Sequence, residues 1–229
     1  NDKLDPVPPS REKEILAALP GYLLSLSGAG KTPAFDHLHV KDFAIRLNAG
    51  TGSLGTPRYY LLIEGKTDHP QDDVILDLKR QTKPSAYPFL SPEQQLVYDH
   101  EFKDDAQRAA FAYRAMTHSA DKYLGWLPLP DGNYLVRERT FVKEAFPLAL
   151  LIDADDYRKM AEQWGEILAT LHARADHLPG RQESEGFARQ VVDQVGKKRS
   201  VFGNLVREVA LQYAAQVRKD WEVFRQTIR

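Results

Sequence analysis

The sequence predicts an α+β protein: a five-stranded antiparallel sheet with one inserted helix, followed by an all-helical segment. Two hydrophobic patterns predict this class. Between residues 43 and 139, short apolar runs suited to strands are joined by tight loops. After Pro147, apolar residues recur every three or four positions, as on one face of a helix. We therefore expect an N-terminal helix and loop (1–34), a sheet domain (35–145) and a helical domain (146–229).

The strands of the sheet domain are predicted from short apolar runs with turn residues between them. Phe43–Leu47 alternates in period 2, and Arg58–Glu64 has the aromatic and branched residues of a buried strand. Val74–Lys79 is the third strand of this meander. The inserted helix begins near Asp104, and Pro130–Asn133 is a strong hairpin turn. Two further strands are expected on either side of that turn, over 124–129 and 134–139.

Proline and glycine predict where the other elements end. Ser10 can cap an N-terminal helix, with Pro20-Gly21 as an expected break in its middle. Pro84, Pro88 and Pro92 keep the stretch after the third strand irregular. In the helical domain, one helix ends at Pro179-Gly180, and Gly196 and Gly203 divide the remainder into two.

Composition excludes several classes of function. The chain has 229 residues, 42% of them hydrophobic, which is enough for a core and excludes wholesale disorder. It contains no cysteine, which excludes disulfides, zinc ribbons and cysteine nucleophiles and fits a cytoplasmic protein. A net charge of -1 argues against a nucleic-acid partner held by bulk phosphate neutralisation. No apolar run approaches the length of a membrane span, so no membrane partner is expected.

The strongest chemical motif is the glycine-rich segment Gly50–Gly55, which reads G-x-G-x-x-G. Glycines allow backbone N–H groups to approach a polyphosphate without interference from a Cβ atom. A dinucleotide fold would continue from such a loop into a helix, whereas here the strand Arg58–Glu64 follows. A glycine loop within a β-hairpin is instead the arrangement of protein kinases.

The kinase interpretation also requires a lysine on the next strand, directed at the phosphates. Lys79 stands there, and the polar stretch Gly65–Asp73 accommodates a longer hairpin loop than ordinary kinases have. The alternative is a plain glycine-rich turn with a lysine that points into water. The loop, the strand order, the lysine and the following helix together favour a nucleotide site.

Other motifs have plainer interpretations. Gly28–Thr32 resembles the end of a P-loop, but Ser25 stands where the first glycine belongs, so we expect a flexible loop. Asp36–His39 with Asp42 has the residue types of a metal site, but a solvated turn before the first strand is the better interpretation. His172–Asp176 has a histidine–aspartate pattern, although it continues a periodic helix.

The chain resembles a bacterial family filed as domain of unknown function 2252. The resemblance rests on Gly50–Gly55, Tyr60–Lys66 and Leu76–Lys79. That family resembles protein kinases and aminoglycoside phosphotransferases with a permuted order of segments, so the resemblance implies a protein-kinase-like fold. The chain lacks the family's catalytic and metal-binding segments and would correspond to its second half. Weaker matches follow in order at Gln107-Arg108, Leu124-Gly125-Trp126, Val136-Arg137-Glu138 and His172-Ala173-Arg174.

The resemblance implies roles for particular residues in binding ATP. The loop residues would contact the phosphates, and Lys79 would pair with them. Asp105 would be the acidic partner of Lys79. Backbone groups of Glu138 and Arg139 would form the hinge that hydrogen-bonds adenine. The implied loop residues are Gly50, Thr51, Gly52, Ser53 and Gly55.

The sequence thus predicts the ATP-binding portion of a kinase-like phosphotransferase. It should be inactive alone, because the Mg²⁺ ligands and the general base are not in this chain. The missing N-terminal half of the same protein is the expected partner. The alternative is a non-catalytic interaction module that keeps the kinase-like scaffold.

Overall fold

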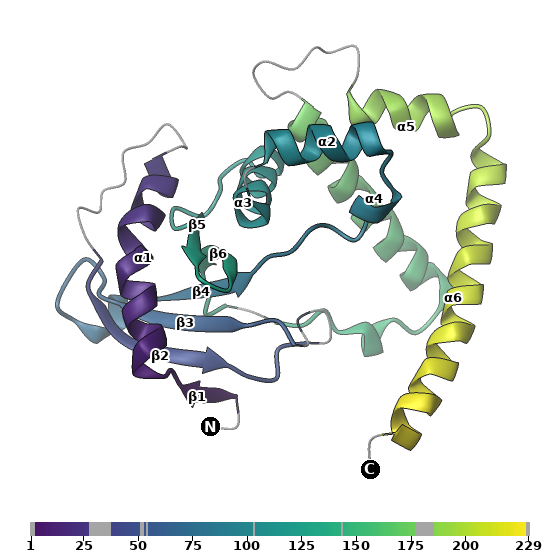
Figure 1. Cartoon of the computed structure of the whole chain (residues 1–229). Coiled ribbons are helices and arrows are strands. Elements are labelled where there is room, and N and C mark those ends of the chain that lie inside the picture. Colours follow the sequence, from purple (N-terminus) through teal and green to yellow (C-terminus); the bar gives the residue numbers. More distant parts are fainter. Residues whose placement is uncertain are drawn as a thin grey trace. The chain divides into compact units, whose positions relative to one another are not determined.

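The computed structural model describes residues 3–27, 38–50, 53, 55–102, 104–142, 144–176 and 186–227. Within these residues the chain is α+β, as the sequence predicts, with six helices and a six-stranded sheet (Figure 1). The strand order is β1-β2-β3-β4-β6-β5, and every neighbouring pair is antiparallel. The chain forms two compact units, Asn1–Tyr157 and Arg158–Arg229, and the sheet belongs to the first.

The strands are β1 (Leu4–Pro6), β2 (Val40–Arg46), β3 (Arg58–Ile63), β4 (Val74–Arg80), β5 (Gly125–Leu129) and β6 (Gly132–Glu138). The helices are α1 (Pro9–Ser27), α2 (Pro92–Glu101), α3 (Asp105–Met116), α4 (Ala154–Asp176), α5 (Phe187–Val195) and α6 (Arg199–Thr227). None of the helices in the described part of the chain is long and apolar enough to cross a membrane.

The prediction of five strands was wrong by one, because the N-terminal lead-in adds β1 to the edge of the sheet. Leu4 pairs with Arg46, and the Leu47 N–H donates to the Lys3 carbonyl at 2.9 Å. Pro6 is tolerated at this position because an edge strand has one side that needs no ladder partner. A three-residue strand has too little periodicity to be predicted from its own sequence.

Two helices also differ from the prediction around proline. α1 continues through Pro20, because its buried residues Ile15, Leu19 and Tyr22 pack on the sheet and compensate for the lost hydrogen bond. α2 occupies part of the stretch predicted to be irregular. Pro92 is at its first turn, where proline has no hydrogen bond to lose, and Ser91 caps it in a capping box.

The main core lies between α1 and one face of the sheet (Figure 1). Alternate residues of β3, β4 and β6 point toward α1, and their side chains are fully buried or nearly so. On the opposite face, Ala109 and Ala110 of α3 pack against Leu124 and Leu135, which covers the β5–β6 end of that face. The core residues that the three strands contribute are Tyr59, Leu61, Ile63, Leu76, Leu78, Tyr134 and Val136.

A polar cluster joins α1 to the β5–β6 turn. Asp131 accepts hydrogen bonds from Arg11 Nη1 and from the Tyr134 hydroxyl, each at 2.8 Å. Burial opposes ionisation of Asp131, but the hydrogen bonds from Tyr134 and Arg11 outweigh burial and hold its pKa below the ordinary value.

This cluster gives an expectation for acid stability. Because the folded-state pKa of Asp131 is lowered, its ionised form stabilises the protein above the unfolded-state pKa of about 3.9, and this contribution is lost as pH falls through the folded-state value. We expect Asp131→Ala to cost about 1–2 kcal/mol in urea unfolding at pH 7. The cost should shrink toward pH 3. A cost that stays constant between pH 7 and pH 3 would contradict this assignment.

Candidate functional site

The glycine-rich loop joins β2 to β3 and is open at the positions that the structure describes. A Cβ atom added to Gly50 or to Gly55 would meet nothing within 4 Å. The backbone of Gly55 has φ +70°, which residues with a side chain rarely adopt. The Ser53 N–H donates to the Gly50 carbonyl at 2.8 Å. The loop therefore forms a tight turn, and no other side chain covers it at Gly50 or at Gly55. Thr51 and Gly52 lie outside the described residues.

Lys79 lies on β4 directly beside this loop. It is paired with Arg58 across the β3–β4 ladder, and the next N–H, that of Arg80, donates to the Pro57 carbonyl at 3.2 Å. Since Leu78 points into the core, Lys79 points to the opposite face of the sheet. Lys79 is half-buried, and its ammonium makes no hydrogen bond or ion pair with any described residue.

Next to Lys79 on the same face is a buried ion pair that the sequence analysis missed. Asp77 is only 3% exposed, and its carboxylate accepts two hydrogen bonds from Arg58, one of them from Nε at 2.6 Å. Arg137 Nε lies 3.9 Å from the same carboxylate. The hydrogen bonds to Asp77, more than burial, determine the pKa of Arg58 and raise it above the ordinary value. An aspartate inside the apolar run of β4 was the one available signal in the sequence.

Arginine also covers the aromatic ring on this face. The Arg139 guanidinium lies 5.4 Å from the centre of the Tyr60 ring, and its Nε donates to the Tyr60 hydroxyl at 3.3 Å. Arg58 approaches the same ring at 6.0 Å. The result is a surface rich in cations, which we call the charged face. It consists of Arg58, Tyr60, Asp77, Lys79, Arg137 and Arg139.

The implied partner of Lys79, Asp105, is engaged by other residues. Its Oδ1 accepts a hydrogen bond from the Tyr98 hydroxyl at 2.6 Å and lies 3.7 Å from Arg108 Nε. Burial and the bond to Asp105 raise the pKa of Tyr98 to about 12. Lys79 and Asp105 therefore form no ion pair in this structure, and Asp105 instead links Tyr98 of α2 to the start of α3.

The backbone N–H groups at the implied adenine hinge already have partners. The Glu138 N–H donates to Asp121 Oδ2 at 2.6 Å, and the Arg139 N–H donates to the Ile75 carbonyl at 2.8 Å. The sheet ladder thus extends through Arg139. A cleft of about 580 Å³ adjoins this point, between the end of α3 and the end of β6, and Arg137 and Glu138 line it together with Thr117 and Asp121.

The remaining motifs do not join the charged face. His39 Nδ1 lies 2.9 Å from a Glu64 carboxylate oxygen, and Asp42 accepts from the Phe43 N–H within β2. Gly28–Thr32, Asp36 and His37 lie outside the described residues. Among the residues that the structure describes, no group of three or more His, Cys, Asp or Glu side chains could hold a metal ion.

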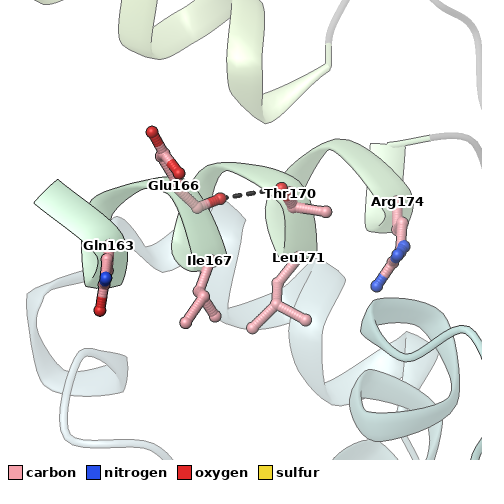
Figure 2. Close-up of a pocket in the computed structure, with 6 residues that line it drawn as sticks. All are labelled: Gln163, Glu166, Ile167, Thr170, Leu171 and Arg174. Carbon is pink, nitrogen blue, oxygen red and sulfur yellow. Dashed lines mark hydrogen bonds between the residues drawn. The ribbon is translucent and has the colours of Figure 1, made fainter.

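His172 lies on α4, in the second unit, with its ring centre 4.5 Å from that of Phe187. A hollow of about 430 Å³ adjoins the same helix. Figure 2 draws the side chains that line it, with the hydrogen bond that Thr170 Oγ1 donates to the Glu166 carbonyl at 2.8 Å. The described residues that line the hollow all belong to α4, and a single helix does not enclose a ligand. They are Gln163, Glu166, Ile167, Thr170, Leu171 and Arg174.

Comparison with protein families matches nearly the whole chain. Residues 1–227 match the family described as uncharacterized protein conserved in bacteria (DUF2252). The chain belongs to this family. The match extends beyond the segments from Gly50 to Arg174 on which the resemblance was recognised. No curated protein and no solved structure matches this DUF2252 chain.

Proposed function

We propose that this DUF2252 chain is the ATP-binding portion of a kinase-like phosphotransferase. In this proposal the glycine-rich loop and Lys79 hold the phosphates. The observation that carries the proposal is Lys79, a half-buried residue whose ammonium has no described partner and which lies beside an open glycine loop. A cation without a counter-ion among the described residues favours an anionic ligand, because the ligand supplies the charge that the described residues do not.

The order of the elements supports the same assignment. The glycine loop lies between β2 and β3, the lysine is on the next strand, and α3 precedes the last two strands. Protein kinases have the same parts in the same chain order, with the lysine directed at the α- and β-phosphates. In both cases the lysine is on the strand that follows the glycine hairpin.

Phosphoryl transfer needs Mg²⁺ ligands and a residue that orients the acceptor. The described residues of this chain do not fit a metal site, so we derive no step through Mg²⁺. The proposal assigns the catalytic carboxylates to another polypeptide segment, with the family's missing N-terminal half as the first candidate. This chain alone would then bind ATP without hydrolysing it.

A second candidate is a non-catalytic interaction module with a kinase-like scaffold. The observation that favours it is the engagement of Asp105 by Tyr98 and Arg108, which leaves Lys79 without the acidic partner that an active kinase needs. This module would bind no nucleotide, so direct binding experiments distinguish the two functions.

Calorimetric titration of ATP with Mg²⁺ into the chain tests the proposal. We expect the wild-type chain to bind and Lys79→Ala to bind about 10- to 100-fold more weakly, because a charge-assisted contact to phosphate contributes about 1.5–3 kcal/mol. Lys13→Ala is the matched control, since this exposed lysine is on α1, across the sheet from Lys79, and its removal should leave the affinity unchanged. Equal affinities for wild type and Lys79→Ala, or no binding by either, would reject the proposal.

A further inference from the structure

We infer that the charged face recognises the phosphates of its ligand and does not read the base, so that the ligand class is polyphosphates in general. This inference rests on the proposed function and specifies its ligand. Three features of the charged face support it: the excess of cations, the contacts that the Tyr60 ring already makes with arginine, and the backbone N–H groups at its edge that already have partners.

The first argument is the balance of charge. The face carries the cations Arg58, Lys79, Arg137 and Arg139, whereas Asp77 is the acidic side chain that the strand register places among them. Both oxygens of Asp77 already accept a hydrogen bond from Arg58. Lys79 has no described partner, and Arg137, whose side chain is 42% exposed, makes only a long ion pair with Asp77 at 3.9 Å. Lys79 and the exposed part of Arg137 are therefore available to contact an anion.

The second argument is that the described residues of the face form no apolar slot for a purine ring beside Lys79. A base-binding pocket is lined mainly by apolar and aromatic side chains. Here the neighbours of Lys79 on the face are Asp77 and Arg58, which form an ion pair. Leu135, which is paired with Lys79 on the next strand, is covered by α3. The Tyr60 ring, which could stack on a base, is already approached by Arg58 and Arg139.

The third argument concerns hydrogen bonds that would identify the base. Discrimination between adenine and guanine requires backbone or side-chain groups that are unpaired before the ligand binds. The N–H of Glu138 is bonded to Asp121, and that of Arg139 is bonded to Ile75. These two donors are not available to a base, whereas the cations of the charged face are available to phosphate.

The test compares ATP, GTP and inorganic triphosphate, each with Mg²⁺, by calorimetric titration into the wild-type chain. We expect affinities within about threefold of one another, since the phosphates provide the shared contact. Raising the salt from 50 to 300 mM should weaken all three together. Arg137→Ala should reduce each affinity by about 3- to 10-fold, and Lys13→Ala should reduce none.

The possible failures are distinguishable. ATP binding that is more than tenfold tighter than binding of GTP and triphosphate would overturn the inference and leave the proposed function standing. Binding that Arg137→Ala does not change would overturn the role of the charged face, provided that circular dichroism shows the variant to be folded. Absence of binding by all three ligands would overturn both the inference and the proposed function.

Discussion

Replacement of Asp77 with alanine is expected to lower the free energy of unfolding by about 3–5 kcal/mol. The reason is that Asp77 is 3% exposed and accepts two hydrogen bonds from Arg58, whose own side chain is only 15% exposed. Without the carboxylate, the Arg58 guanidinium keeps the cost of burial and loses the partner that offsets it. Urea unfolding followed by circular dichroism measures the change.

Two further variants separate this cause from a general effect of removing an aspartate. Asp99→Ala also breaks an ion pair, with Lys83, but both side chains are about half exposed, so we expect a much smaller loss than for Asp77→Ala. The double variant Asp77→Leu with Arg58→Met replaces the pair by apolar groups and should recover most of the lost stability. A loss below 1 kcal/mol for Asp77→Ala would show that the buried pair does not stabilise the sheet.

Gly125→Ala is expected to cost about 2–3 kcal/mol, because α1 packs directly on the backbone of β5 at this residue. An added Cβ atom would lie 2.4 Å from Ser25 Oγ, 2.9 Å from Tyr22 Cε2 and 3.0 Å from Leu26 Cδ2. Ser25 cannot move away freely, since its hydroxyl donates to the Tyr22 carbonyl and accepts from the Trp126 N–H. A thermal melt should show a midpoint lower by about 4–10 °C.

Gly21→Ala is the control, on α1, the helix that packs on Gly125. A Cβ atom at Gly21 would meet nothing within 4 Å, and alanine in a helix interior is favoured over glycine by about 0.5–1 kcal/mol. The control should therefore raise the melting midpoint while Gly125→Ala lowers it. A shift in the same direction for both variants would contradict the close approach of α1 to β5.

The sequence predicted the strands that carry a regular pattern. In β3, Tyr59, Leu61 and Ile63 alternate with half-buried residues, whereas in β4 three consecutive residues, Leu76 to Leu78, are buried. Turn chemistry was equally informative at Gly132, whose φ of +139° closes the β5–β6 hairpin. These signals are local, since each depends on residues close together in the chain.

The elements that were missed depend on partners far along the chain. β1 forms because Leu4 pairs with Arg46, and α1 continues through Pro20 because its apolar face packs on the sheet. Neither contact can be predicted from the local pattern of apolar residues. The helix α2 differs from the prediction for another reason: Pro84, Pro88 and Pro92 predict an irregular stretch, although Pro92 in a first turn favours a helix.

For the candidate site, sequence pattern predicts which residue types occur and in which order: the glycine loop, the following strand and its lysine. The electrostatic surroundings of these residues depend on the folded chain. The pairing of Arg58 with Asp77, the position of Arg137 opposite that carboxylate and the engagement of Asp105 by Tyr98 all follow from strand register and helix packing. The physical reason is range: periodicity and turn preference arise from neighbouring residues, whereas the charge around a side chain is set by whichever distant segments fold against it.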